Sequence, residues 1–230
     1  MSDLNRELEA LLRESGADLV GFADMRGVPG AELPLGIAVG VKLPPQIVRS
    51  ISDGPSLAYH DAYHDINARL DRIVTAGAEF LTNLQYQAAA HTTKAVVRLD
   101  NTRTLLPHKT VAIRAGLGWI GRCAMLVTQE YGSAVRLSAL LTDAPLDCAR
   151  PVDESSCGDC AECVRHCPAS AVTGEKWSAG MERERLMNAS ECRETARKLS
   201  FERFGKEVTL CGKCIEVCPY TRRYLRLAEG

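Results

Sequence analysis

The sequence lacks any long apolar run, and no segment approaches the roughly 20 consecutive apolar residues that span a bilayer. Aromatic residues are also scarce, at 5% of the 230 residues. The first residues, Met1 to Glu7, do not show the basic start and apolar stretch of a secretory signal. These absences predict a cytoplasmic protein that does not interact with a membrane.

An excess of charge is missing as well. The chain has 28 Lys and Arg residues against 29 Asp and Glu residues, a formal net charge of -1. Such a protein has no global attraction for a phosphate backbone, so any contact with nucleic acid must come from a local patch. Arg222, Arg223 and Arg226 form a small basic tail of this kind.

Cysteine, in contrast, is abundant, with ten residues in the chain. Eight of them form two runs separated by one single cysteine: Cys157, Cys160, Cys163 and Cys167-Pro168, then Cys192, then Cys211, Cys214 and Cys218-Pro219. The first run is the bacterial ferredoxin pattern C-x2-C-x2-C-x3-C-P, in which three cysteines bind one [4Fe-4S] cubane and the fourth crosses to another. The sequence therefore predicts two [4Fe-4S] clusters.

The crossing pattern predicts which cysteines bind each cluster. One cluster is expected to be bound by Cys157, Cys160, Cys163 and Cys218. The second run lacks a third cysteine before its C-x3-C-P, so counting adds the single cysteine to the other set: Cys167, Cys192, Cys211 and Cys214. Pro168 and Pro219 are expected to end the local helix and turn the chain away from the clusters.

Zinc is the alternative metal, because C-x2-C pairs also bind zinc. Zinc, however, does not call for two C-x3-C-P runs. Disulfides are disfavoured, because such close spacings without a signal peptide are typical of metal binding in a reducing compartment. Two cubanes, each -2 with its four thiolates, would change the net charge from -1 to about -5. Cys123 and Cys148 lie outside the pattern, and we expect both to be small buried apolar residues.

Helices and strands alternate through the first part of the chain. Apolar spacing predicts helices at residues 4–14, 56–90 and 108–115, the second being one long helix or two with Gly77 as a weak point. Strands are predicted at residues 19–23, 35–43, 94–99 and 123–128. A turn at 131–133 leads into a strand at 134–141 and predicts a hairpin. This alternation is typical of an α/β or α+β layer domain.

A boundary is expected within residues 143–156, which contain prolines and acids without periodicity. We therefore predict an α/β domain over residues 1–150 and a ferredoxin-like domain over residues 151–230. In the second domain, residues 178–199 are predicted to be helical. This domain has little hydrophobic mass, so the clusters are expected to serve as its core.

The segment Gly116-Leu117-Gly118-Trp119-Ile120-Gly121 matches the dinucleotide pattern G-x-G-x-x-G. That fingerprint should follow a strand and open a helix, whereas here a predicted helix precedes the glycines and a predicted strand follows them. We therefore do not expect a nicotinamide site. A glycine-rich loop that carries a Trp instead indicates a place where the backbone approaches a flat ligand closely.

This segment resembles the N-terminal domain of the epoxyqueuosine reductase family, together with its flanking Arg114 and Arg122 and with the later motifs Tyr131-Gly132-Ser133 and Leu140-Leu141-Thr142-Asp143. The cysteine half resembles the same family, in which a single cysteine follows an Arg-rich helix between the two runs. The resemblance covers nearly the whole chain and is loose before residue 90.

The resemblance implies an α/β (α+β) domain of cobalamin-binding type followed by a bacterial ferredoxin-like domain. The family uses base-off cobalamin beside two [4Fe-4S] clusters to reduce the epoxide of a modified wobble nucleoside in tRNA, and it continues into a helical-repeat domain beyond the point where this sequence ends. The implied corrin contacts are His64, Gly116, Gly118, Trp119, Ile120 and Gly121. The family's catalytic Asp falls near Thr102 or Asp100. Asp100 follows a predicted strand, where α/β sites gather, and is the expected proton donor.

We therefore expect an iron–sulfur, cobalamin-dependent reductase supplied by a low-potential electron donor. Its two clusters would pass electrons to a corrinoid that reduces a small-molecule or unknown substrate, with tRNA ranked below these. Two alternatives stay open: a reductive activator that serves a corrinoid partner protein, and a plain electron carrier.

Overall fold

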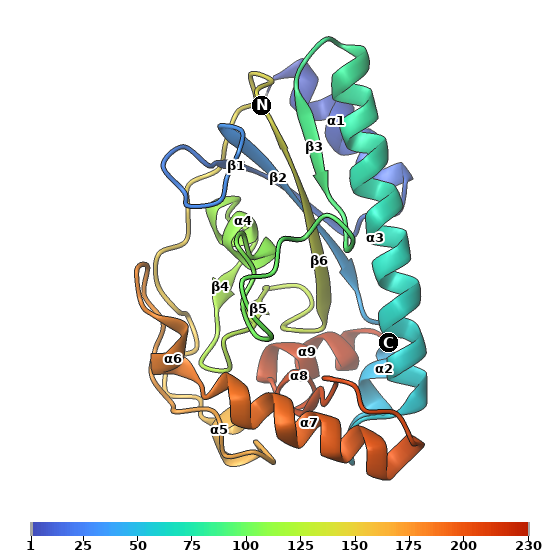
Figure 1. The fold of residues 1–230 in the computed structure, drawn as a ribbon, viewed down its shortest axis with the longest axis vertical. Coiled ribbons are helices and arrows are strands. Elements are labelled where there is room, and N and C mark those ends of the chain that lie inside the picture. The colour runs from blue at the N-terminus through green and yellow to red at the C-terminus, as the bar shows by residue number, and fades with distance from the viewer. Residues whose placement is uncertain (1, 230) are drawn as a thin grey trace. The chain divides into compact units, whose positions relative to one another are not determined.

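The computed structural model describes residues 2–229, and within them a four-stranded sheet in the order β1-β2-β6-β3 (Figure 1). β1 (Leu19–Asp24) and β2 (Leu35–Lys42) form an antiparallel pair in which Leu19 lies opposite Gly40. β3 (Ala88–His91) pairs antiparallel with β6 (Val135–Thr142), and Ala88 lies opposite Thr142. β1 and β2 are buried along nearly their whole length, which explains why their sequences show continuous rather than alternating apolar residues.

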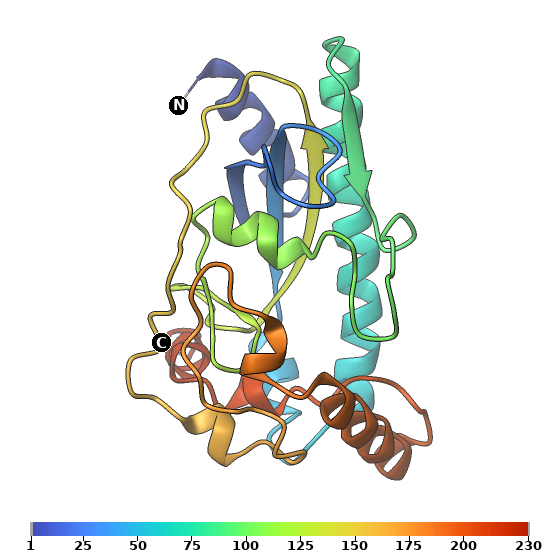
Figure 2. The same ribbon diagram turned by 60° about the vertical axis from the view of Figure 1, so that its left-hand side comes forward.

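Three helices cover the sheet. α1 (Asp3–Glu14) and α3 (Leu57–Asn83) lie on one face, and α4 (His108–Arg114) lies on the other (Figures 1 and 2). α3 is a single helix of 27 residues, which decides between the two alternatives left open by the sequence. Gly77 does not break this helix. A Cβ at Gly77 would lie 2.9 Å from Leu12 of α1, so the glycine permits close packing.

One strand prediction is wrong. Residues 94–99 are a loop with a single bridge between Arg98 and Thr104, and the side chains of Val97 and Leu99 are 54% and 60% exposed. The strand lies earlier, at β3, where the segment Ala88-Ala89-Ala90-His91 has no β-branched residue. Pairing with β6 decides its conformation, because strand preference depends on the neighbouring strands more than on intrinsic propensity.

The predicted hairpin is also wrong. The predicted strand at 123–128 contracts to β5 (Leu126–Val127), which pairs with β4 (Trp119–Ile120). β6 lies between β2 and β3 in the four-stranded sheet and is not the hairpin partner of β5. One bridge between Thr128 and Gly132 is all that remains of the predicted hairpin in the part of the chain that the structure describes.

The chain divides into two compact units. The first comprises residues 1–41, 65–117 and 136–152, and the second comprises residues 42–64, 118–135 and 153–230. The predicted division at residue 150 differs from this arrangement in two segments, because residues 42–64 and 118–135 belong with the cysteines. The cysteine-bearing segment has few apolar residues, and these two segments contribute the apolar residues that its core needs.

The contacts within the second unit show how the apolar mass is added. Leu43, Val48 and Ile51 are fully buried. A Cβ at Gly212, within the second cysteine run, would lie 2.5 Å from Cδ1 of Ile51, so the Ile51 side chain packs directly against the Gly212 backbone. The hydroxyl of Tyr224 donates a hydrogen bond to the carbonyl of Leu43 at 2.9 Å.

The helices of the second unit are mostly short: α2 (Pro45–Arg49), α5 (Glu162–Arg165), α6 (Arg183–Leu186), α7 (Ala189–Phe204), α8 (Lys213–Glu216) and α9 (Pro219–Leu227). The helix predicted at 178–199 is therefore two helices. The break lies at Met187, which is extended, and at Asn188, whose side chain accepts hydrogen bonds from the backbone of Ser190 and Glu191 and so caps α7.

No helix within residues 2–229 is both long enough and apolar enough to cross a membrane.

Candidate functional site

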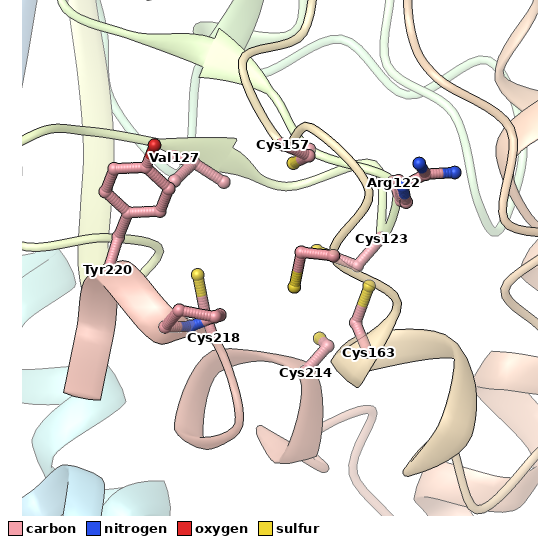
Figure 3. A pocket seen from close by; sticks show the side chains of 11 residues that line it. Arg122, Cys123, Val127, Cys157, Cys163, Cys214, Cys218 and Tyr220 are labelled. Atoms are coloured by element: carbon pink, nitrogen blue, oxygen red, sulfur yellow. The ribbon is translucent and has the colours of Figure 1, made fainter.

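Six cysteines line one pocket of the second unit (Figure 3). The pocket contains about 380 Å³ of space not filled by protein atoms, part of which is open to solvent. It contains all four cysteines that the ferredoxin pattern assigns to one cubane and two more, so that its thiols are Cys157, Cys160, Cys163, Cys218, Cys123 and Cys214. The structure therefore brings the first predicted ligand set together.

Short helices and turns position these thiols. The amide of Cys160 donates to the carbonyl of Cys157 at 3.2 Å, and Cys163 follows in the one-turn helix α5. Cys218 is the N-cap residue of α9, and Pro219 is the first residue of that helix. The preceding helix α8 ends with its C-cap at Val217, so Pro219 follows the end of one helix, as expected, and also begins the next. Proline is well suited to the first helical position because its missing N–H would have no partner within the helix.

The pocket disfavours charged thiols in the absence of a compensating positive group. A hydrogen bond with Cys123 and then burial raise the pKa of the Cys163 thiol well above its ordinary value. Burial also raises the pKa of Cys218, although the backbone N–H groups of Thr221 and Tyr220 act against it. Iron ions offset such a penalty, because they bind the thiolate form.

Arg122 adds an unpaired donor at this pocket. Its guanidinium donates to the carbonyls of Gly174 and Gly158, yet its Nε is buried and has no hydrogen-bond partner within residues 2–229. A buried donor without a partner is costly, and an anionic group in the pocket would relieve that cost. A cubane bound by four thiolates carries such a negative charge.

The spread of the thiols bears on the identity of the metal. In the described part of the chain, no three Cys, His, Asp or Glu side chains converge as the ligands of one metal ion do. The six thiols instead surround a space of about 380 Å³. A four-iron cluster, whose iron atoms bind thiols that lie apart from one another, fits this arrangement of thiols better than a single zinc ion does. The residues present therefore fit the first predicted cluster.

A second group of thiols consists of Cys167, Cys192 and Cys211. Burial, followed by the charges of Cys167 and Cys211, raises the pKa of Cys192. Burial and the charge of Cys167 raise the pKa of Cys211, against a hydrogen bond from the Lys213 backbone. The charges of Cys167 and Cys211 thus act on Cys192, and the assignment of Cys192 to this ligand set stays a prediction. Their fourth predicted partner, Cys214, lines the pocket of the first group.

The glycine-rich segment faces the first thiol pocket. The indole Nε1 of Trp119, which is 3% exposed, donates to the sulfur of Cys157 at 3.4 Å. The Trp119 ring also meets the Tyr220 ring edge-on, at 4.9 Å between centroids. A Cβ at Gly121 would lie 3.6 Å from the Cys157 sulfur. For Trp119 and Gly121 the observed neighbour is thus a predicted cluster ligand, and a contact with a corrin stays a prediction, as it does for the buried Ile120.

The other glycines of the motif have structural roles. Gly116 follows α4 with φ +71°, and the amides of Gly116 and Leu117 donate to the carbonyls of Ile113 and Ala112. These two bonds end the helix as a Schellman motif. A Cβ at Gly118 would collide with the carbonyl oxygen of Val127. A helix precedes the motif and a strand follows it, as predicted, which is the reverse of a dinucleotide fingerprint.

His64 and Asp100 lie on the surface. The exposed ring of His64 is 4.6 Å from that of His60, measured between centroids. The exposed carboxylate of Asp100 accepts hydrogen bonds from Thr102 and Arg103, and the backbone N–H of Thr102 is the main cause of its lowered pKa. A lowered pKa makes a carboxyl group a weaker proton source at neutral pH. Both assignments stay predictions.

Cys123, Arg122 and Tyr220 are pocket residues that the sequence analysis did not assign. The sequence predicts that Cys123 is a small apolar residue of the core. It is buried, but its neighbours are the thiols of Cys163 and Cys214. Its position directly after the glycine motif was the available signal, since that motif indicated a close approach of the backbone to a ligand.

Comparison with known proteins agrees with the pocket. Residues 156–221 match a family model described as a 4Fe-4S double cluster binding domain. The epoxyqueuosine reductase of Listeria monocytogenes is 32% identical over 160 residues, which cover 64% of this chain and 40% of that relative. The predicted resemblance is therefore confirmed, and this chain spans less than half the length of that relative.

Solved structures confirm the predicted fold class. A reductive dehalogenase, whose structure is described as suggesting a mechanism for B12-dependent dehalogenation, superposes with a TM-score of 0.74 at 20% identity, over 96% of this chain and 33% of the other. An epoxyqueuosine reductase in complex with a modified tRNA-Tyr stem loop gives a TM-score of 0.60 at 21% identity, over 95% and 65% of the two chains. At this level of identity the likeness shows a common fold.

Proposed function

We propose that this chain, with its double cluster domain and its similarity to epoxyqueuosine reductases, is an iron–sulfur reductase that passes electrons from two [4Fe-4S] clusters to cobalamin. The observation that carries the proposal is the pocket in which Cys157, Cys160, Cys163 and Cys218 lie together. These four cysteines come from both runs, as the crossing of ligands in a two-cluster ferredoxin requires.

The cluster of this pocket is called the near cluster below, and the one assigned to Cys167, Cys192, Cys211 and Cys214 the distal cluster. The clusters supply one-electron transfer, and cobalamin supplies a reducible cobalt centre. The protein holds the half-buried thiols in place, with the Trp119 N–H donating to the sulfur of Cys157 and the Arg122 guanidinium at the pocket wall. These groups would stabilise the negative charge that a cluster gains on reduction.

The cobalamin part of the proposal is supported by the relatives. The residues expected against the corrin are His64, Gly116, Gly118, Trp119, Ile120 and Gly121, and we propose that their surfaces form part of its site. Trp119 and Gly121 contact Cys157 on one side, so a corrin beyond them would lie close to the near cluster. This placement would suit electron transfer from the cluster to cobalt.

The experiment measures the two cofactors separately. Protein reconstituted without oxygen should bind roughly eight irons and an equal amount of sulfide. Titration with the holoprotein should then change the visible absorbance of cobalamin, and this change should saturate at one equivalent. Fewer than about eight irons would contradict the cluster assignment. Full iron content without a spectral change of cobalamin would contradict the corrin part alone.

The substrate is proposed at the level of its class. The relatives are named for a modified tRNA nucleoside and for a halogenated compound, and this chain has a net charge of only -1. A small-molecule substrate therefore ranks above tRNA, which would need a local basic patch such as Arg222, Arg223 and Arg226. A low-potential donor in the cytoplasm would supply the electrons.

A second candidate function is a reductive activator of a corrinoid partner protein, without a substrate of its own. The state of Asp100 favours it, since the expected proton donor is exposed, hydrogen-bonded to its own loop and lowered in pKa. A reductase needs a proton source beside its substrate, whereas an activator does not. The activator should reduce protein-bound cob(II)alamin faster than free cob(II)alamin, and equal rates would contradict it.

A further inference from the structure

Cys123 lies in the tight turn between β4 and β5. The amide of Gly121 donates to the carbonyl of Met125 at 2.8 Å, and the amide of Ala124 donates back to Gly121 at 2.8 Å. Ala124 has φ +58°, a left-handed conformation that few non-glycine residues adopt. The turn presents the Cys123 side chain to the inside of the unit, where it is 7% exposed.

The surroundings of Cys123 are those of a ligand rather than of a core residue. Its thiol lines the same pocket as the four predicted near-cluster ligands, with Cys163 and Cys214 beside it (Figure 3). Figure 3 shows these thiols around one space. A cubane takes four thiolates, so this pocket contains more thiols than one cluster uses.

Cys148, the other cysteine outside the two runs, provides a contrast. It is exposed in the first unit, and its thiol contacts the carbonyl of Leu146 at 3.6 Å. It lines a pocket of the first unit whose other lining residues include no cysteine. Neither cysteine lies within residues 156–221, which match the double cluster domain. Position in the fold alone therefore distinguishes Cys123.

We propose that Cys123 is a fifth thiol of the near-cluster site and can replace Cys163 as an iron ligand. In the exchange, the Cys123 thiol releases its proton to solvent and forms an Fe–S bond, while the Cys163 sulfur leaves the same iron and takes up a proton. No electron is transferred, and the cluster keeps four thiolates. The choice of Cys163 follows from its place beside Cys123 in their common pocket (Figure 3). The inference rests on the proposed presence of two clusters.

The test compares single and double variants after anaerobic reconstitution. Cys163→Ala should keep roughly eight irons, because Cys123 completes the ligand set, and its reduced near cluster should give altered EPR g values. Cys163→Ala/Cys123→Ala should keep about four irons, those of the distal cluster, which also show that the chain still folds. Cys157→Ala is the matched control and should keep about four irons, because the Cys157 sulfur lies against Trp119 and Gly121 and the proposed exchange involves Cys163.

Three results would overturn the inference. The first is a Cys163→Ala protein with four irons or fewer, and the second is a double variant that still binds eight. The third is a Cys123→Ala protein that has lost half its iron, since Cys123 would then be an obligatory ligand rather than a substitute. Wild-type protein with fewer than eight irons would contradict the proposed function itself, which keeps the two failures apart.

Discussion

Single side chains at the thiol pocket decide how a cluster would behave there. Trp119 is the clearest case, because its indole N–H donates to the sulfur of Cys157 at 3.4 Å. Hydrogen bonds to ligand sulfurs stabilise the more negative, reduced state of a cluster and so raise its reduction potential. Through its bond to Cys157, Trp119 can thus adjust the reduction potential without binding iron.

Replacing Trp119 with Phe should leave the iron content at roughly eight and make the near-cluster potential more negative, since one N–H···S bond is lost. An EPR-monitored redox titration measures this change. Tyr220→Phe is the matched control, because it keeps the ring that packs against the indole. An unchanged potential in the Trp119 variant would show that this bond does not influence the cluster.

Replacing Cys192 with Ala should remove about half of the iron, because Cys192 is the ligand that counting and the proximity of Cys167 and Cys211 both assign to the distal cluster. Iron and sulfide analysis after anaerobic reconstitution gives the answer. Cys148→Ala serves as the control and should keep the full iron content, since that residue is exposed in the other unit. Full iron in the Cys192 variant would remove it from the ligand set.

At the scale of elements, the β4–β5 hairpin matters most, because it brings Gly121 and Cys123 to the pocket and Trp119 to the sulfur of Cys157. Its strands have two residues each, so close backbone packing must stabilise it. Gly118 permits that packing, as a Cβ there would collide with the Val127 carbonyl. The G-x-G-x-x-G pattern thus has a structural explanation in this hairpin and in the end of α4.

Gly118→Ala should lower the apparent Tm of the anaerobic holoprotein by about 3 °C or more, since overpacking against backbone costs roughly 1–3 kcal/mol. Differential scanning calorimetry measures the shift. Gly180→Ala is the control, because Gly180 also has a positive φ of +82° but no atom within 4 Å of its Cβ position. Equal shifts in the two variants would mean that conformation, and not the Val127 contact, requires glycine at position 118.

At the scale of the whole molecule, stability should depend on pH through His108 of the first unit. Burial lowers the pKa of His108, and the charges of His91 and Arg136 lower it further, against hydrogen bonds to the carbonyls of Leu137 and His91. Its Nε2 is buried without a partner within residues 2–229. The folded protein therefore binds this proton less readily than the unfolded chain does, and stability should fall as the pH drops below the ordinary value of 6.5.

His108→Gln should reduce this loss, because an amide keeps a donor for the Leu137 carbonyl and does not titrate. The measurement is the apparent Tm of both proteins between pH 7.5 and pH 6, where the slope should be smaller for the variant. His60→Gln is a suitable control on the protein's other unit. Parallel slopes for wild type and the His108 variant would assign the pH dependence to other groups.

The sequence by itself determined the local and the chemical features. The apolar periodicity predicted α1, α4, β1 and β2, because each follows from the pattern of its own residues. The cysteine spacing predicted two clusters and one complete ligand set, because a short loop must bring its thiols to one side, and it singled out Cys192 by counting.

Only the tertiary structure decided which distant segments pair and pack. In the structure, β3 is formed by an alanine segment, and β6 lies between β2 and β3 rather than beside β5. Residues 42–64 and 118–135 belong to the same unit as the cysteine runs. The structure also shows that Cys123, which the sequence predicts to be a core residue, lines the thiol pocket. The physical reason is the same in each case: a strand, a core or a ligand shell is completed by partners far away in the chain, and local spacing carries no information about them.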